Sequence, residues 1–181
     1  MVQPSPGLPP LPSSRSDAGL SQVLSRLSQR LGRDRLVQQT TDRLRNCLAV
    51  NRVVLYYFYR HWEGQVTFES LSHPRYSILG STGPDECFNG DYAEMYLQGR
   101  VRAIADIEAA DIHECHREFL RGIQVQANLV VPVLVENGLW GLLVAHHCDG
   151  IRDWSASDVS SMLEAAEQLA TSPTINSTPT Q

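Results

Sequence analysis

The sequence has no excess of positive charge with which to hold a nucleic acid. Its 15 Lys and Arg residues are outnumbered by 20 Asp and Glu residues, so the formal net charge is -5. Because proteins bind phosphate backbones through clustered basic side chains, we expect no nucleic-acid partner. Long apolar runs are also missing, and prolines stand near the N-terminus where a signal peptide would carry its apolar core. The sequence therefore predicts a cytoplasmic protein without membrane insertion.

Recognisable metal-binding and phosphate-binding motifs are absent as well. None of the four cysteines belongs to a C-x-x-C pair or another zinc-like spacing, and no glycine-rich phosphate loop is present. In a reducing compartment these cysteines are expected to be free thiols unless they bind a ligand. The sequence thus predicts no metal site, and the chemistry of individual thiols remains to be explained.

The composition is that of one globular domain with polar ends. Apolar residues make up 42% and charged residues 19% of the 181 residues, which is ordinary for a soluble domain with its own core. Residues 1–17 are rich in Pro and Ser, and residues 172–181 are almost wholly polar. We expect both ends to be tails without fixed structure, flanking one domain at 18–171.

Apolar residues at helical spacing predict three helices. Two precede the strands in the sequence and one follows them. The first spans residues 20–31, and Asp34 is expected to cap the second, which runs to Leu48. Ser155 and Asp158 resemble a capping box at the start of the third helix.

Segments rich in β-branched and aromatic residues predict the strands. They lie at 52–60, 65–72, 101–107, 127–135 and 139–147. Asn137-Gly138 suits a tight hairpin between the last two, and Pro132 removes a ladder donor, which predicts an edge or a bulge. The order of elements predicts an α+β fold with a central antiparallel sheet of five to six strands. The terminal helices are expected on one face and residues 73–100 over the other.

Two cysteines lie in contexts that favour reactivity. Asp111 is expected to cap a short helix with Cys115 in its first turns, where the helix dipole and two neighbouring histidines favour the thiolate. Cys87 lies in Asp85-Glu86-Cys87-Phe88, between Gly-Pro and Asn-Gly dipeptides that predict a loop. An exposed loop thiol oxidises readily, so Cys87 indicates a ligand.

Together these motifs resemble a cyanobacteriochrome GAF domain of the Asp-Xaa-Cys-Phe subfamily, within the phytochrome superfamily. The resemblance spans residues 20–171. It rests on the motifs at 85–88, 99–107, 115–116, 127–132 and 139–146. It implies a GAF fold whose bilin pocket lies on the face of the sheet opposite the terminal helices.

The resemblance implies a photoreceptor that holds a linear tetrapyrrole, phycocyanobilin or its isomer phycoviolobilin, through a thioether at Cys115. Cys87 is implied as a second, reversible thiol that adds to the bridge between rings B and C, which shortens the conjugation and gives a blue-absorbing state. Light isomerises the bond between rings C and D, the second thioether breaks, and absorption moves toward the green. The resemblance also implies that the chain attaches the bilin without a separate lyase. Apart from this self-attachment, it implies a photosensory module and not an enzyme.

The resemblance also implies a set of chromophore-binding residues, namely Asp85, Phe88, His116, Arg100, His146 and Asn128. His116 is expected to pack against the central rings, Asp85 to accept a pyrrole or thiol proton, and His146 to approach ring D. Arg100 and Arg102 fall on the same face of the expected strand, so either could pair with a propionate, and Arg100 is preferred. From the residues alone, both arginines also fit solvated charges at a strand end.

Two other functions are weighed against this one. A GAF-type thiol-dependent reductase of a small sulfoxide would also use cysteines on pocket loops, but it needs a resolving thiol and leaves the Asp-Xaa-Cys-Phe motif unexplained. The other is a GAF module that binds a small ligand or a cyclic nucleotide. The sequence has neither the phosphate-cradling loop nor the basic cluster that a cyclic nucleotide would need. The signalling output is expected outside this chain, in a downstream domain or protein, and the terminal helices offer a surface for a homodimer.

Overall fold

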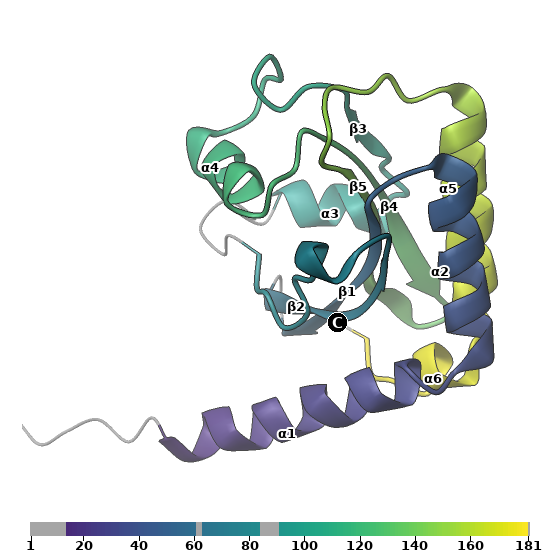
Figure 1. Ribbon diagram of the computed structural model, residues 1–181. Helices are drawn as coiled ribbons and strands as arrows, with labels where there is room; N and C mark the ends of the chain where they lie inside the picture. The colour runs from purple at the N-terminus through teal and green to yellow at the C-terminus, as the bar shows by residue number, and fades with distance from the viewer. Residues whose placement is uncertain (1–13, 61–62, 84–90, 181) are drawn as a thin grey trace, which may run out of the picture.

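An antiparallel sheet of five strands lies at the centre of the computed structural model, which describes residues 14–60, 63–83 and 91–180 (Figure 1). The strands are ordered β2-β1-β5-β4-β3 across the sheet. Their bounds are β1 (Arg52–Arg60), β2 (Glu63–Leu71), β3 (Arg102–Ile104), β4 (Ala127–Val135) and β5 (Gly138–His147). The α+β class and the antiparallel sheet predicted from the sequence are therefore confirmed.

The third strand is shorter than the sequence predicts, and this accounts for the position of Pro132. β3 pairs only with Asn128, Leu129 and Val130 of β4. At Pro132, β4 pairs with β5 on one side and with none of the described strands on the other, so it is locally an edge. A proline is tolerated there because the missing N–H breaks no continuous ladder.

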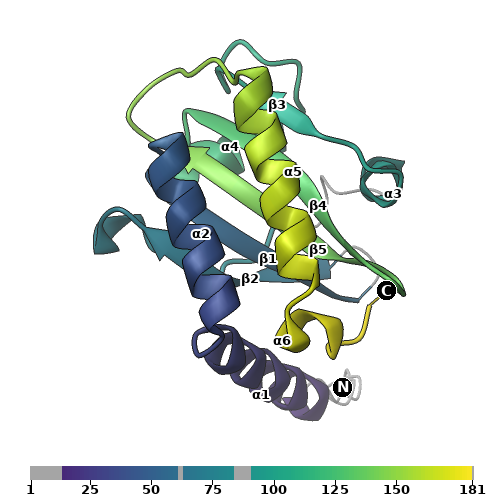
Figure 2. The ribbon, with the colours of Figure 1, turned by 90° about the vertical axis from the view of Figure 1, so that its right-hand side faces the viewer.

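A layer of helices covers one face of the sheet. It consists of α1 (Ser14–Leu31), α2 (Arg35–Leu48) and α5 (Ala156–Ala170). Figure 2 shows α2 and α5 side by side across the sheet, with α1 at the end of α2. Fully buried leucines from all three helices, such as Leu31, Leu48 and Leu169, pack on the strands in one apolar core. None of the described helices is long and apolar enough to cross a membrane.

The C-terminal segment is ordered, although its polar composition predicts a tail from residue 172. The Ser172 hydroxyl is fully buried and donates to Asp34 at 2.6 Å, and it also caps the short helix α6 (Pro173–Asn176). Ile175 is fully buried in the helical layer, and the Tyr57 hydroxyl donates to the carbonyl of Pro179 at 2.9 Å. A few specific contacts thus fix a segment that has little apolar surface. At the other end, α1 begins at Ser14, within the predicted tail 1–17.

Asp34 holds the start of α2 and the C-terminal segment together. One carboxylate oxygen accepts the N–H groups of Leu36 and Val37 at 3.0 and 3.3 Å, as the sequence predicts for an N-cap, while the other accepts from Ser172. Although burial raises the pKa of Asp34, hydrogen bonds led by the one from Ser172 hold it below its usual value of 3.8.

Asp34→Ala is expected to lower the free energy of unfolding by about 1–2 kcal/mol at neutral pH, because it removes the helix cap and the Ser172 contact. A depressed carboxyl pKa contributes stability above its unfolded value and loses it as the pH falls through the folded one. The deficit should therefore shrink below the usual value of 3.8. Urea unfolding at neutral and acidic pH measures it, with exposed Asp153→Ala as control. An equal deficit in both variants would contradict the assignment.

The other face of the sheet carries the remaining elements. These are the 3-10 turn η1 (Pro74–Tyr76), α3 (Asp91–Leu97) and α4 (Glu114–Gly122). Figure 1 shows α3 and α4 on the side of the sheet opposite α2 and α5. This is the face on which the sequence predicts the pocket.

Candidate functional site

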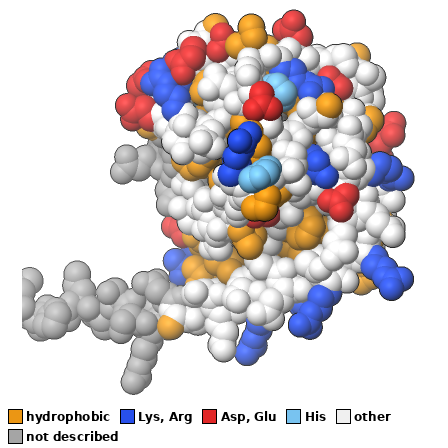
Figure 3. Space-filling view, in the orientation of Figure 1, with side chains coloured by type: hydrophobic (Ala, Val, Ile, Leu, Met, Phe, Trp, Pro, Cys, Tyr) orange, Lys and Arg blue, Asp and Glu red, His pale blue; other side chains and the backbone are white. Residues whose placement is uncertain are grey.

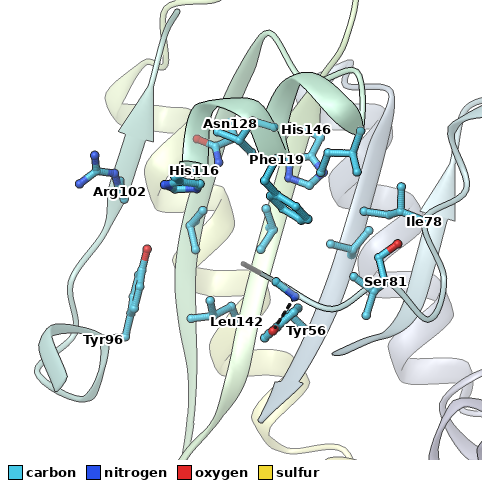
Figure 4. A pocket seen from close by; sticks show the side chains of 17 residues that line it. Tyr56, Ile78, Ser81, Tyr96, Arg102, His116, Phe119, Asn128, Leu142 and His146 are labelled. Atoms are coloured by element: carbon cyan, nitrogen blue, oxygen red, sulfur yellow. Dashed lines mark hydrogen bonds between the residues drawn. The ribbon is translucent and has the colours of Figure 1, made fainter. Parts of the chain in front are cut away.

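A pocket lies between the sheet and the elements that cover this second face (Figure 4). Alternate residues of the central strands form its floor, because successive side chains of a strand point to opposite faces. These floor residues are Val54, Tyr56, Asn128, Val130, Leu142, Val144 and His146. His116, Phe119 and Leu120 of α4 line it from above, and the space between the lining atoms, including its mouth, is about 620 Å³.

Four nitrogen-containing side chains lie together in one part of a mostly apolar pocket. Figure 4 shows Arg102, His116, Asn128 and His146 in this part, away from Leu142 and Tyr56. Asn128 is 3% exposed, and its amide oxygen accepts no hydrogen bond; Nε of Arg102 is likewise buried without an acceptor. Because unsatisfied buried groups are costly, this arrangement favours a ligand that donates to Asn128 and accepts from Arg102.

His116 presents a neutral ring to the pocket. It follows Cys115 on α4 and is half-buried. Burial, with a smaller contribution from the Arg102 charge, lowers the pKa of His116 to about 4. At neutral pH the imidazole can therefore pack against an apolar ring system without carrying a charge into it.

Cys115 lies in the first turn of α4, but the cap of this helix differs from the prediction. The helix begins at Glu114, so the capping residue is His113 and not Asp111. Nδ1 of His113 accepts the Cys115 N–H at 3.3 Å and lies 3.2 Å from the Cys115 sulfur. Cys115 is disulfide-bonded, contrary to the expectation of free thiols, whereas Cys47 and Cys148 are free. Nucleophilic chemistry at Cys115 therefore requires its reduced form.

Charged contacts hold α4 in place over the pocket. Arg117 donates to the carbonyls of Ile107 and Ala110 at 3.2 and 2.9 Å, which ties the helix to the segment before it. Arg121 pairs with Glu108 and, at 3.0 Å, with Glu114. Figure 3 shows acidic and basic side chains gathered over this helix. The outer face of α4 is thus solvated, while its inner face carries His116, Phe119 and Leu120 into the pocket.

The structure brings several of the predicted site residues together. His116, Asn128 and His146 all line the pocket. Asp85, Cys87 and Phe88 lie outside the described residues.

Of the two arginines considered for a propionate, Arg102 is among the described residues that line the pocket. Gly99 adopts a left-handed conformation at the end of α3, with φ of 84°, and the Arg100 N–H donates back to the Met95 carbonyl at 3.0 Å. Arg100 therefore belongs to the helix end, and strand alternation begins only at Arg102. The sequence argument for Arg100 used a strand that begins at residue 101, whereas β3 begins at Arg102, and the arginine that would hold a propionate stays a prediction.

Other pocket residues carry no signal in the sequence. Tyr96 is 4% exposed and lines the pocket from α3, and the Tyr56 hydroxyl accepts the N–H of Gly83 at 3.0 Å. Each reaches the pocket only through tertiary packing. Within the described part of the chain, no group of three or more His, Cys, Asp or Glu side chains is placed to hold a metal ion.

The chain is similar to proteins with GAF domains. A family model described as GAF domain matches residues 32–172. An uncharacterised protein of Picosynechococcus sp. is 54% identical over 154 residues, covering 85% of this chain and 94% of that protein. The circadian input-output histidine kinase CikA of Synechocystis sp. is 32% identical over 83% of this chain, which spans only 23% of the kinase.

Solved structures of similar fold include bilin photoreceptors. The cyanobacteriochrome receptor PixJ has 33% identity and a TM-score of 0.71, covering 81% of this chain and 95% of that one. The blue-light absorbing form of the Thermosynechococcus elongatus PixJ GAF domain has 34% identity and a TM-score of 0.69, with coverages of 79% and 83%. The phycocyanobilin-bound GAF domain of a cyanobacterial phytochrome has 29% identity and a TM-score of 0.67, with coverages of 83% and 91%.

Proposed function

This chain belongs to the GAF domain family, and from that premise we propose that it is a bilin-binding photosensor domain of the cyanobacteriochrome type. The observation that carries the proposal is the apolar pocket with unsatisfied polar groups at one end, beside Cys115 on α4. Similar structures that are named as bilin photoreceptors support it.

The described residues fit the demands of a linear tetrapyrrole. The pigment needs a flat apolar slot, acceptors for its pyrrole N–H groups, a cation for a propionate, and a thiol for attachment. The amide oxygen of Asn128 is the acceptor, Arg102 is the cation, and Cys115 is the thiol. When bound, phycocyanobilin or phycoviolobilin supplies visible absorption and light-driven isomerisation.

Two thiols bind the pigment in this proposal, and they have different roles. Cys115 anchors the pigment permanently, and Cys87 adds reversibly to its central bridge, with Asp85 as acceptor of the thiol proton. The dark state then absorbs blue light and the photoproduct absorbs in the green region. The sequence motif Asp85-Glu86-Cys87-Phe88 supports this part of the proposal.

The chain acts as a photosensory module and not as an enzyme in this proposal. Its output lies in a further domain or a partner protein, as the much longer histidine kinase among its relatives suggests. A cyclic-nucleotide site is disfavoured because Arg102 is the only cationic side chain among the described lining residues. A thiol-dependent sulfoxide reductase is the second candidate, since Cys115 directly precedes the pocket residue His116 on α4.

The absorption spectrum of the chain made in cells that also make phycocyanobilin tests the proposal. We expect a coloured protein whose main band changes reversibly under alternating blue and green light, and a colourless protein from cells without the pigment. A folded chain that stays colourless, under reducing conditions and with pigment present, would overturn the proposal. Thiol-dependent reduction of a small sulfoxide by that chain would favour the second candidate.

Leu142→Trp is expected to reduce pigment content about tenfold or more, because an indole on the 3% exposed floor position fills the slot. The ratio of visible to ultraviolet absorbance of the purified chain measures it. Leu134→Trp, on the exposed part of β4, is the matched control and should keep its pigment. Equal pigment content in the two variants would mean that the ligand lies elsewhere.

A further inference from the structure

A row of polar side chains crosses the pocket face of the sheet where apolar residues would be expected. Arg52 on β1 pairs in register with His146 on β5, and His146 pairs with Asn128 on β4. Paired residues of neighbouring strands point to the same face. The three are buried, with exposures of 1%, 5% and 3%. Figure 4 shows the two that line the pocket, His146 and Asn128, near one another.

Arg52 donates hydrogen bonds from three nitrogens to three different segments. Nε donates to Nδ1 of His146 at 2.8 Å, Nη1 to the carbonyl of Tyr76 at 2.8 Å, and Nη2 to the carbonyl of Ile123 at 2.7 Å. Among the described residues no carboxylate forms an ion pair with it. Burial of an arginine whose acceptors are all neutral costs free energy, because its charge is desolvated without a counter-charge. This cost indicates that Arg52 has a role beyond packing.

The contact with Arg52 determines where the His146 proton lies. A guanidinium has only donors, so Nδ1 of His146 must present its lone pair, and the proton of the neutral ring is then on Nε2. Protonation of Nδ1 would set one N–H against another. Burial is the main reason why the pKa of His146 lies well below its usual value. The charge of Arg52 on β1 and the titratable ring of His116 on α4 lower this pKa further.

We propose that Arg52 is a positioning residue that holds His146 as a neutral ring with its proton on Nε2, so that the pocket presents a fixed hydrogen-bond donor there. A ligand must then turn an oxygen toward His146, whereas one strand away the Asn128 oxygen requires an N–H. The identity of that ligand rests on the proposed function, but the state of the ring does not.

The test uses ¹⁵N-histidine-labelled full-length chain without pigment, with two-bond ¹H–¹⁵N spectra recorded between about pH 5 and pH 8. His146→Gln identifies the signals of this ring by their loss. We expect Nδ1 unprotonated and Nε2 protonated across the whole range in the native chain. Signals of this ring that titrate in this range, or a ring protonated on Nδ1, would overturn the proposal whether or not the variants at position 52 fold.

Two substitutions at position 52 separate the His146 contact from the other contacts of the arginine. Arg52→Met and Arg52→Gln both lose the guanidinium that bridges the carbonyls of Tyr76 and Ile123, but only Gln keeps an N–H donor for Nδ1. In the Met variant the ring should exchange between tautomers or titrate, and the absorption of the pigment-loaded chain should become pH-dependent. The Gln variant should restore the native ring state. A folded Met variant with the native ring state would overturn the proposal.

The outcomes separate the two proposals. If the chain binds no bilin, the spectra without pigment still decide the role of Arg52. If His146 titrates but the chain is photoactive, the proposed function stands and only the positioning role fails.

Discussion

Cys115→Ala should abolish attachment of the pigment that survives denaturation. The thioether at this position is the only stable covalent link in the proposed mechanism, so its loss leaves at most non-covalent pigment in the slot. Zinc-enhanced fluorescence after denaturing electrophoresis measures the attached bilin, and we expect no band above background. The fold should persist, because Cys115 is only half-buried on a helix that other contacts hold.

The matched control for this variant is Cys148→Ala, which removes a free and partly buried thiol. Both proteins should be made under reducing conditions, because Cys115 is otherwise disulfide-bonded. The control is expected to keep a band of native intensity. A band of native intensity in Cys115→Ala would remove this cysteine from its assigned role.

Cys87→Ala should abolish the blue-absorbing dark state while the pigment stays attached through Cys115. The reason is electronic, since a thiol that adds to the central bridge divides the conjugated system, and absorption returns to longer wavelength when that thiol is absent. Absorption spectra before and after illumination measure the effect. Treatment of the native photoproduct with a thiol-blocking reagent should have the same result, because it prevents Cys87 from adding again.

Cys47→Ala is the control for the second thiol, since Cys47 is a free and exposed cysteine on α2. Its spectra should match those of the native chain. Asp85→Asn should slow or bias the thiol addition, because a carboxylate can take the thiol proton. A Cys87→Ala protein with a blue-absorbing dark state and native conversion would show that one thiol is enough.

The elements that could be predicted from the sequence are those fixed by local chemistry. The strand segments 52–60 and 127–135 coincide with β1 and β4, because the first is a dense run of β-branched and aromatic residues and the second is rich in valine. Asp34 caps α2 as predicted, and Ser155 with Asp158 forms the predicted capping box of α5. Such signals depend on neighbours within four residues along the chain.

The elements that could not be predicted depend on contacts between distant segments. Composition alone predicts a tail from residue 172, and it cannot show that Ser172 reaches Asp34. The sequence spacing of Cys47 along α2 does not show on which side of the helix it lies, and the structure places it at the exposed surface. The buried position of Arg52 could not be anticipated either, since charged residues at strand ends are usually solvated.

The division of the central strands between two layers has a practical consequence for engineering. From Val53 to Tyr57, from Asn128 to Val131 and from Leu142 to His146, even-numbered residues face the pocket and odd-numbered residues face the helices. On the N-terminal side of Gly141 this alternation breaks, since the even-numbered Trp140 faces the helices. A library confined to the even positions of these stretches would change the surroundings of the proposed pigment and leave the odd positions packed. Colour and thermal tolerance could then be selected independently on the same strands.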